Sequence, residues 1–133
     1  MMRVESRVGE RISDILSAEK RGGLHIAMLD VLRTLVVCGG TSWKSELVRD
    51  LALFRTFKGG TGAVDEKELD EALGRLGKEG LVKVEKRMRA DMSARGGAED
   101  ELITLVDLSA TRNALARDRV MSSYIREQTM VLR

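Results

Sequence analysis

The side chains that most often carry out catalysis or hold metals are scarce in this sequence. His25 is the only histidine and Cys38 the only cysteine. A closed zinc site draws its ligands mainly from these two residue types, so no such site is expected. A serine–histidine–aspartate triad would have to use His25, and nothing else in the sequence supports one. Cys38 lies in an apolar stretch, which favours a small buried side chain over a reactive thiol.

The glycine-rich segment 58–63 is the stretch that most resembles a phosphate-binding loop. It reads KGGTGA, whereas a P-loop carries a Gly-Lys-Ser/Thr step that opens a helix after a strand. Because that step is missing, we expect a flexible turn. No nucleophile elbow, paired-acid motif or cofactor fingerprint occurs elsewhere. The sequence therefore predicts neither an enzyme nor a bound cofactor or metal.

Positive charge is the chemical feature that the sequence concentrates locally. The net charge is only +2, but the segment 81–95 carries more basic than acidic residues. Its basic residues are Lys83, Lys86, Arg87, Arg89 and Arg95. A local basic patch matters more to nucleic-acid binding than the charge of the whole chain. This segment is therefore the first candidate for contact with a polyanion.

A helix is predicted over residues 65–80, just before the basic segment. Asp65 is an N-cap residue, and Glu68, three positions later, completes a capping box. Leucines then recur at helical spacing along one face. Gly80 can end the helix because glycine adopts the left-handed conformation without a Cβ clash. The helix should present a leucine face to the core and a charged face to solvent.

A β-hairpin is predicted directly after this helix. Apolar and polar side chains alternate over 81–88, and a second β-rich run covers 101–107. The residues between them, 89–100, are mostly polar and include two consecutive glycines, which is typical of an exposed loop. The basic segment would therefore form one strand of the hairpin and part of its loop.

This combination resembles a known family of domains. The residues Leu73-x-x-Leu76-x-x-Glu79-Gly80-Leu81-Val82, followed by a basic strand, a polar loop and a second strand, resemble the recognition helix and wing of a winged helix-turn-helix domain. They are similar to those of MarR-like and PadR-like prokaryotic regulators. The resemblance covers residues 24–107 and implies a mainly α fold with a small β-hairpin wing. We place the winged helix-turn-helix core at 22–107, an N-terminal amphipathic helix at 1–21 and a C-terminal helix at 108–133.

Three helices are expected before the one at residue 65. The first covers 3–20 and is amphipathic. The second covers about 24–38 and is more apolar, so it should lie deeper in the core. The third covers about 43–57, with Thr41-Ser42 as its N-cap. A winged helix also implies a short first strand near this point, so the segment 41–44 is extended in the alternative interpretation.

The resemblance implies that the helix 65–80 enters the major groove of DNA. The face opposite its leucines carries side chains that can contact bases or phosphates. These are Lys67, Glu71, Arg75 and Lys78. The basic hairpin residues would follow the backbone or enter the minor groove, with an affinity that falls steeply in salt. Ser42 and Lys44, at a helix N-terminus, could hold a phosphate. The expected function is a DNA-binding transcriptional regulator.

The acidic start of the helix 65–80 leaves a second function open. Capping and the helix dipole account for the first carboxylates. Asp70 and Glu71 lie further along the helix, where their charge opposes binding to a polyanion. Winged helices in general transcription and replication factors use the same helix to dock a protein. A protein–protein interaction module is therefore the alternative function.

The two terminal segments are predicted to form helices outside the winged-helix core. The last one reads as a single long helix from about 109 to 131 with a broad apolar stripe. We expect both to form a homodimer interface, because two-fold oligomers are common and their DNA sites are palindromic. The side chains assigned to this interface are Val8, Ile12, Ile15, Leu115, Met121, Tyr124 and Ile125. In the alternative, the two helices pack on each other within one subunit.

Location and further partners are predicted only in outline. No apolar run is long enough to cross a membrane, and the first residues lack the apolar core of a signal peptide. We therefore expect a cytoplasmic protein with no membrane contact. Double-stranded DNA is the expected partner, and no residue points to a small-molecule effector.

Overall fold

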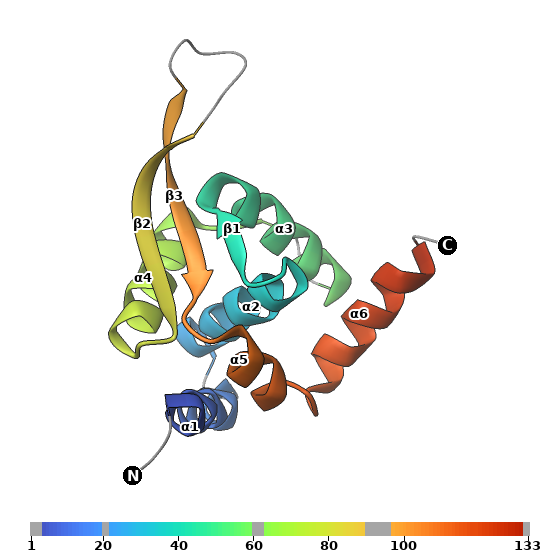
Figure 1. Cartoon of the computed structure of the whole chain (residues 1–133). Coiled ribbons are helices and arrows are strands. Elements are labelled where there is room, and N and C mark those ends of the chain that lie inside the picture. The colour runs from blue at the N-terminus through green and yellow to red at the C-terminus, as the bar shows by residue number, and fades with distance from the viewer. Residues whose placement is uncertain (1–3, 20–21, 60–62, 90–96, 132–133) are drawn as a thin grey trace.

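The computed structural model describes residues 4–19, 22–59, 63–89 and 97–131. These residues form helices and a small sheet (Figure 1). In chain order the elements are α1 (Val4–Ser17), α2 (Leu24–Val37), β1 (Thr41–Trp43), α3 (Lys44–Phe57), α4 (Glu66–Lys78), β2 (Val82–Arg89), β3 (Ala98–Leu105), α5 (Leu108–Ala114) and α6 (Arg119–Val131). The fold is mainly helical, as the sequence predicts. None of the described helices is long and apolar enough to span a membrane.

Helix α4 begins where the sequence predicts. The side chain of Asp65 accepts a hydrogen bond from the backbone N–H of Lys67 at 2.9 Å, which satisfies one of the free donors of the first turn. Glu68, expected to complete the capping box, instead accepts a hydrogen bond from the guanidinium of Arg55 at 2.9 Å. This ion pair ties α4 to α3. Gly80 has a φ of +75° and ends the helix in the left-handed conformation.

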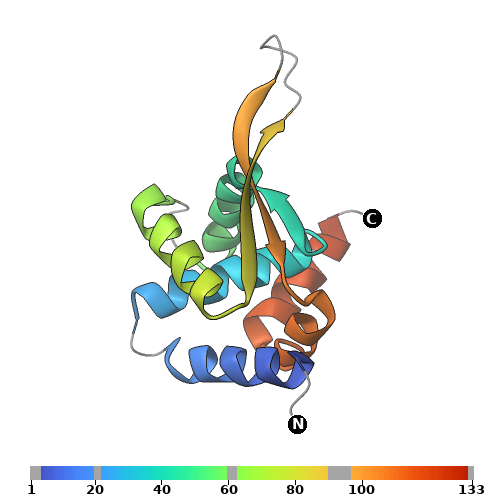
Figure 2. The same cartoon turned by 60° about the vertical axis from the view of Figure 1, so that its left-hand side comes forward.

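The sheet contains three antiparallel strands in the order β1-β3-β2. The extended alternative for residues 41–44 is therefore confirmed by β1, whose Ser42 lies opposite Ile103 of β3. Strand β3 begins at Ala98, earlier than the predicted 101, because it pairs with the whole length of β2 up to Arg89. In Figures 1 and 2 the far end of this hairpin projects beyond the helices.

Helix α2 is the centre of the fold. Every residue from Ala27 to Val36 is buried, as expected for a helix that is more apolar than the first and should lie deeper in the core. It contacts α3 and α4, and Figure 2 shows it passing behind the sheet. The inward side chains of the sheet complete the core, with Ile103 fully buried and Val82 and Leu105 each 4% exposed. This core fixes α4 and the hairpin relative to each other.

The terminal helices pack within the subunit. The apolar side chains that they bury therefore belong to the core of one chain and not to the dimer interface that the sequence predicts. Helix α1 lies against α5, beneath the rest of the fold in Figure 2. All but one of the side chains assigned to a dimer interface are buried in this single chain. The buried ones are Val8, Ile12, Ile15, Leu115, Met121 and Tyr124. Ile125 is 45% exposed. The alternative of packing within one subunit therefore describes these residues, and a homodimer stays a prediction that would need other contacts.

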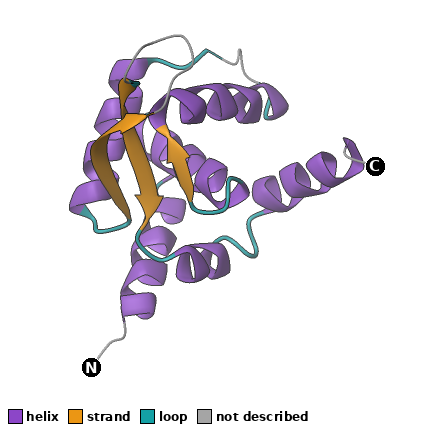
Figure 3. Cartoon of the chain, turned by 45° about the horizontal axis from the view of Figure 1, so that its top comes forward, coloured by secondary structure: helices purple, strands orange, loops and turns teal. Residues whose placement is uncertain are grey.

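The single long helix predicted near the C-terminus is two helices. The chain turns between α5 and α6, where the N–H of Asp118 donates to the carbonyl of Leu115 at 3.1 Å. Figure 3 shows α6 leaving the body at an angle to α5. Tyr124 of α6 packs edge-on against Phe54 of α3, with ring centroids 4.8 Å apart. The apolar stripe continues through the break because both helices bury one face.

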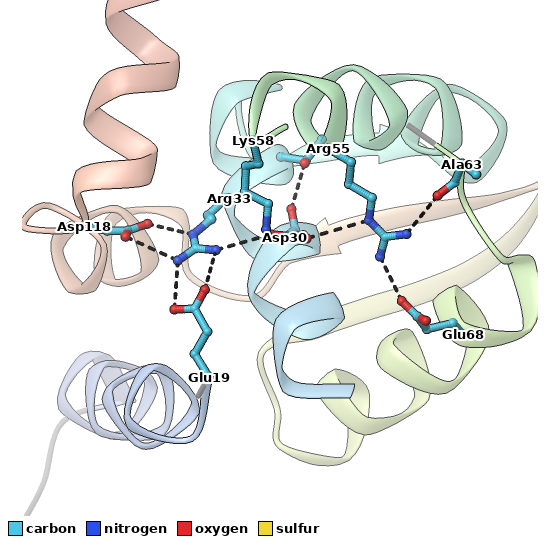
Figure 4. A network of polar contacts seen from close by, with 9 residues as sticks. Glu19, Asp30, Arg33, Arg55, Lys58, Ala63, Glu68 and Asp118 are labelled. Carbon is cyan, nitrogen blue, oxygen red and sulfur yellow. Dashed lines mark hydrogen bonds and ion pairs between the residues drawn. The ribbon is translucent and has the colours of Figure 1, made fainter. Parts of the chain in front are cut away.

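A buried arginine joins these terminal helices to α2 (Figure 4). Arg33 is fully buried, and its guanidinium lies 2.7 Å from Asp118 and 3.2 Å from both Asp30 and Glu19. Asp30, itself 1% exposed, also receives the Lys58 ammonium at 2.6 Å. Burial opposes the charge of Arg33, but the hydrogen bonds to Asp118 and Glu19 raise its pKa above the ordinary value. Through Glu19, just after α1, and Asp118, just before α6, the network links these helices to the middle of α2.

Candidate functional site

Helix α4 presents a charged face to solvent beside the hairpin. Leu69, Ala72, Leu73 and Leu76 are buried, so the opposite face is the exposed one. The candidate residues Lys67, Glu71, Arg75 and Lys78 are all exposed. Arg75 lies 3.6 Å from Glu79, one turn along the helix. Within the described part of the chain, no ion pair holds Lys67 or Lys78. These two lysines can therefore meet an anion without first leaving an internal partner.

The basic side chains of β2 divide between the two faces of the hairpin. Lys83 and Arg87 lie on one face, and both pair with Glu85 between them at 2.6 Å. These hydrogen bonds, from Lys83 foremost, lower the pKa of Glu85 below its ordinary value. Lys86 points to the other face and lies opposite Glu101 in the register. It is exposed, and no ion pair holds it among the described residues.

Arg89 is fixed at the start of α3. Its guanidinium lies 2.6 Å from Glu46 and 3.4 Å from Asp100, and it donates to Ser45 Oγ at 3.0 Å. It also lies over the Trp43 ring, 5.4 Å from the centroid. The hydrogen bond to Glu46 raises the pKa of Arg89 above its ordinary value. Arg89 therefore clamps the hairpin to α3.

Asp100 forms the other half of this clamp. Its carboxylate accepts a hydrogen bond from Ser45 Oγ at 2.6 Å and another from the backbone N–H of Ser45. Desolvation alone would raise the pKa of Asp100, but these hydrogen bonds and Arg89 lower it below the ordinary value. The Asp100 carboxylate from β3 thus accepts a hydrogen bond from a free backbone N–H of the first turn of α3, as the side chain of an N-cap residue before the helix would normally do.

Lys44, the first residue of α3, lies between α4 and β3. Its ammonium is 2.5 Å from Asp70 and 3.4 Å from Glu101. The hydrogen bond to Asp70, followed by the contact with Glu101, raises the pKa of Lys44 above its ordinary value. A shallow groove between α4 and β2 begins at this ion pair. The groove is lined by Lys44, Asp70, Leu73, Gly74, Gly77, Val82, Val84 and Glu101.

One candidate for phosphate contact, Ser42, is not placed as expected. Ser42 is 7% exposed, and its hydroxyl donates to the carbonyl of Trp43 at 3.1 Å. It is an inward-facing strand residue, so its assignment to a phosphate contact was wrong. The residue before α3 is Trp43, which makes no side-chain cap, so the predicted Thr41-Ser42 cap was wrong as well. Arg95 lies outside the described residues.

The residues that hold these basic side chains were not predicted from the sequence. Trp43, Ser45, Glu46 and Asp100 come together only when the hairpin folds back onto α3. A sequence signal did exist for the buried network: Arg33 stands in the apolar run of α2, with Asp30 three positions earlier on the same face. A charged pair in such a run indicates a buried ion pair.

Possible metal ligands and the single cysteine bear on whether the described residues could catalyse a reaction. No group of three or more histidine, cysteine or acidic side chains there could hold a metal ion. Cys38 is half-buried, and burial, followed by the charge of Asp50, raises the pKa of its thiol to about 11. A thiol with so high a pKa is a poor nucleophile at neutral pH.

Comparison of the chain with protein-family models, curated proteins and solved structures finds no match. The resemblance to winged-helix regulators therefore stays a prediction.

Proposed function

We propose that this chain is a winged-helix protein that binds double-stranded DNA and regulates transcription. The support is the element order α2-β1-α3-α4-β2-β3 and the sheet order β1-β3-β2, which are the elements that the resemblance implies. The observation that carries the proposal is that the exposed charged face of α4 lies beside a projecting hairpin (Figures 1 and 2). A helix of this width fits the major groove, and a hairpin beside it can reach the neighbouring backbone.

In this proposal, exposed lysines that hold no ion pair among the described residues contact the DNA phosphates. Lys67 and Lys78 on α4 and Lys86 on β2 are exposed and carry no internal ion pair among the described residues. They can neutralise phosphates at no cost in broken protein contacts. Arg75, paired only at 3.6 Å with a solvent-exposed partner, is the side chain best placed on α4 for bidentate contact with a guanine.

A second candidate function is docking to a protein partner. Val84 and Met88 lie on the same face of β2 and are 37% and 64% exposed. Val84 lines a groove together with the acidic residues Asp70 and Glu101, and exposed apolar side chains next to acidic ones suit a protein surface better than a duplex. In this case the hairpin and α4 would contact another protein with the same faces.

The test measures the affinity for a mixed-sequence DNA duplex of about 20 base pairs. Fluorescence anisotropy reports this affinity at each concentration of a salt series. We compare the wild type with the triple variant Lys67→Ala/Lys78→Ala/Lys86→Ala. The control variant Arg7→Ala/Arg112→Ala/Arg126→Ala removes the same charge from exposed positions on the terminal helices. The lysine variant should bind more weakly and lower the salt slope by about 0.9 for each phosphate that is no longer neutralised. The control should retain most of the wild-type affinity.

Two results contradict the proposal. One is the absence of wild-type binding at low salt, which would favour the docking function. The other is an equal loss of affinity in both triple variants, which would show that only net charge matters. In either case α4 and the hairpin would not form a specific DNA interface.

A further inference from the structure

The basic side chains around the start of α3 are occupied by carboxylates from other elements. Lys44 lies between Asp70 of α4 and Glu101 of β3. The same arrangement recurs next to it, where Asp100 of β3 fills the place of an anion at the first turn of α3 and meets Arg89. Phosphate oxygens make the same kind of contact with ammonium, guanidinium and backbone N–H groups. The carboxylates thus make contacts of the kind that the phosphates of a bound strand would make.

The groove next to Lys44 has small and apolar residues along its walls and charged side chains at its end. On α4 it is lined by Gly74 and Gly77, and a Cβ at either position would meet no neighbouring atom within 4 Å. On β2 it is lined by Val82 and Val84. Small and apolar walls suit deoxyribose rings, while a cation at the end of the groove suits a phosphate. The groove also lies between the two elements that the proposed function places on the duplex.

We infer that Asp70 and Glu101 are built-in competitors of DNA, which hold Lys44 in the free protein and release it to a backbone phosphate in the groove. The inference rests on the proposed function and adds how the affinity of the protein for DNA is set. DNA binding becomes an exchange, in which the Lys44 ammonium gives up two carboxylates and gains one phosphate oxygen. Among the described residues, Lys44 has no other ion-pair partner that would need to leave.

The exposure of the ion pair makes this exchange feasible. The side chain of Lys44 is 20% exposed, that of Glu101 32% and that of Asp70 59%. Solvent-accessible ion pairs are weak and are readily replaced. Breaking this pair should weaken DNA binding by about two- to fivefold relative to a free lysine, which follows from the usual strength of such pairs. Removing the Asp70 charge should therefore tighten binding.

A matched variant separates this exchange from simple charge repulsion. Glu71 follows Asp70 on α4, is exposed, and holds no ion pair among the described residues. Asp70→Asn and Glu71→Gln each remove one negative charge from the same helix. Repulsion alone predicts the same gain in affinity from both variants. Exchange predicts that the gain from Asp70→Asn exceeds the other by about two- to fivefold.

The experiment measures duplex affinity by anisotropy at several salt concentrations for both variants, for Lys44→Ala and for Lys44→Ala/Asp70→Asn. In the Lys44→Ala background, Asp70→Asn should gain no more than Glu71→Gln gains in the wild type. Lys44→Ala should also lower the salt slope by about 0.9. Thermal unfolding of each variant checks that α4 and the hairpin remain folded, and Glu101→Gln provides an independent release of the same lysine.

The outcomes distinguish the inference from the proposed function. If no variant binds DNA at low salt, the proposed function fails and the inference fails with it. If DNA binds but Asp70→Asn gains no more than Glu71→Gln, or if Asp70→Asn and Glu101→Gln weaken binding, the inference alone is overturned. In that case the Lys44 ion pair is a structural link between α3, α4 and β3.

Discussion

Replacing Arg33 tests how the terminal helices are held to the fold. Arg33→Met keeps an unbranched side chain of similar length and removes the buried guanidinium. Asp30 and Asp118, which are 1% and 10% exposed at their side chains, then lose their shared partner. Breaking a buried ion pair by removing one member typically costs about 3–5 kcal/mol, because the remaining charge stays buried and unpaired. The same guanidinium pairs with Glu19 as well, so a loss of stability in this range is expected.

Two features place the expected loss near about 3 kcal/mol, at the lower end of that range. Asp30 keeps the Lys58 ammonium at 2.6 Å, and Glu19 is 32% exposed and can be solvated. The assay is urea unfolding followed by circular dichroism, with the free energy of unfolding extrapolated to zero denaturant. Arg75→Met is the control, since Arg75 is 53% exposed and its partner lies 3.6 Å away. It should change the free energy of unfolding by less than about 0.5 kcal/mol.

A double-mutant cycle tests whether the loss of stability comes from the interaction between Arg33 and Asp118. Asp118→Asn should be destabilising in the wild type and much less so in the Arg33→Met background, because the guanidinium that lies 2.7 Å from Asp118 is then absent. A loss of stability below about 1 kcal/mol for Arg33→Met would refute the reasoning. Additive effects of the two substitutions would refute it as well, since the residues would then be independent.

Further predictions concern single positions. Cys38, whose thiol pKa is raised from 9.0 to about 11, should react with a disulfide reagent roughly 100-fold more slowly at pH 8 when folded than when unfolded, because the thiolate is the reactive form. The raised pKa means that the folded state favours the protonated thiol. The stability that this preference contributes is therefore fully present below pH 9.0 and is lost as the pH rises through about 11. Gly40→Ala should destabilise the fold by about 1–3 kcal/mol in urea unfolding, since Gly40 has a φ of +97° and an added Cβ would lie 3.3 Å from Leu108. Asp65→Ala should cost about 1 kcal/mol in the same assay through loss of the α4 cap, whereas Glu66→Ala, one residue later, should cost less.

Local sequence signals were sufficient for α4 and the hairpin. The N-cap at Asp65, the leucine spacing and the stop at Gly80 act within a few residues, so they can be read without knowledge of the rest of the fold. The alternation in β2 likewise predicts a strand. The expected exposure of Lys67, Arg75 and Lys78 followed from helix geometry alone and is what the structure has.

Contacts between distant elements could not be predicted in this way. An apolar stripe shows that a helix buries one face, but it does not show whether the partner is the same chain or a second copy. Ile12 and Leu115 were therefore assigned to a dimer although they belong to the subunit core. The ion pairs of Lys44 and Arg89 were missed for the same reason, since their partners are 26 and 43 residues away in the sequence.

The most direct test of the central claim is the location of the surface that DNA contacts. We would titrate an isotopically labelled sample with a mixed-sequence duplex and follow backbone amide chemical shifts by nuclear magnetic resonance. The proposed function predicts that the largest changes fall on α4, on the start of α3 at Lys44 and on β2. Changes confined to α1, α5 and α6, or no changes at low salt, would contradict it.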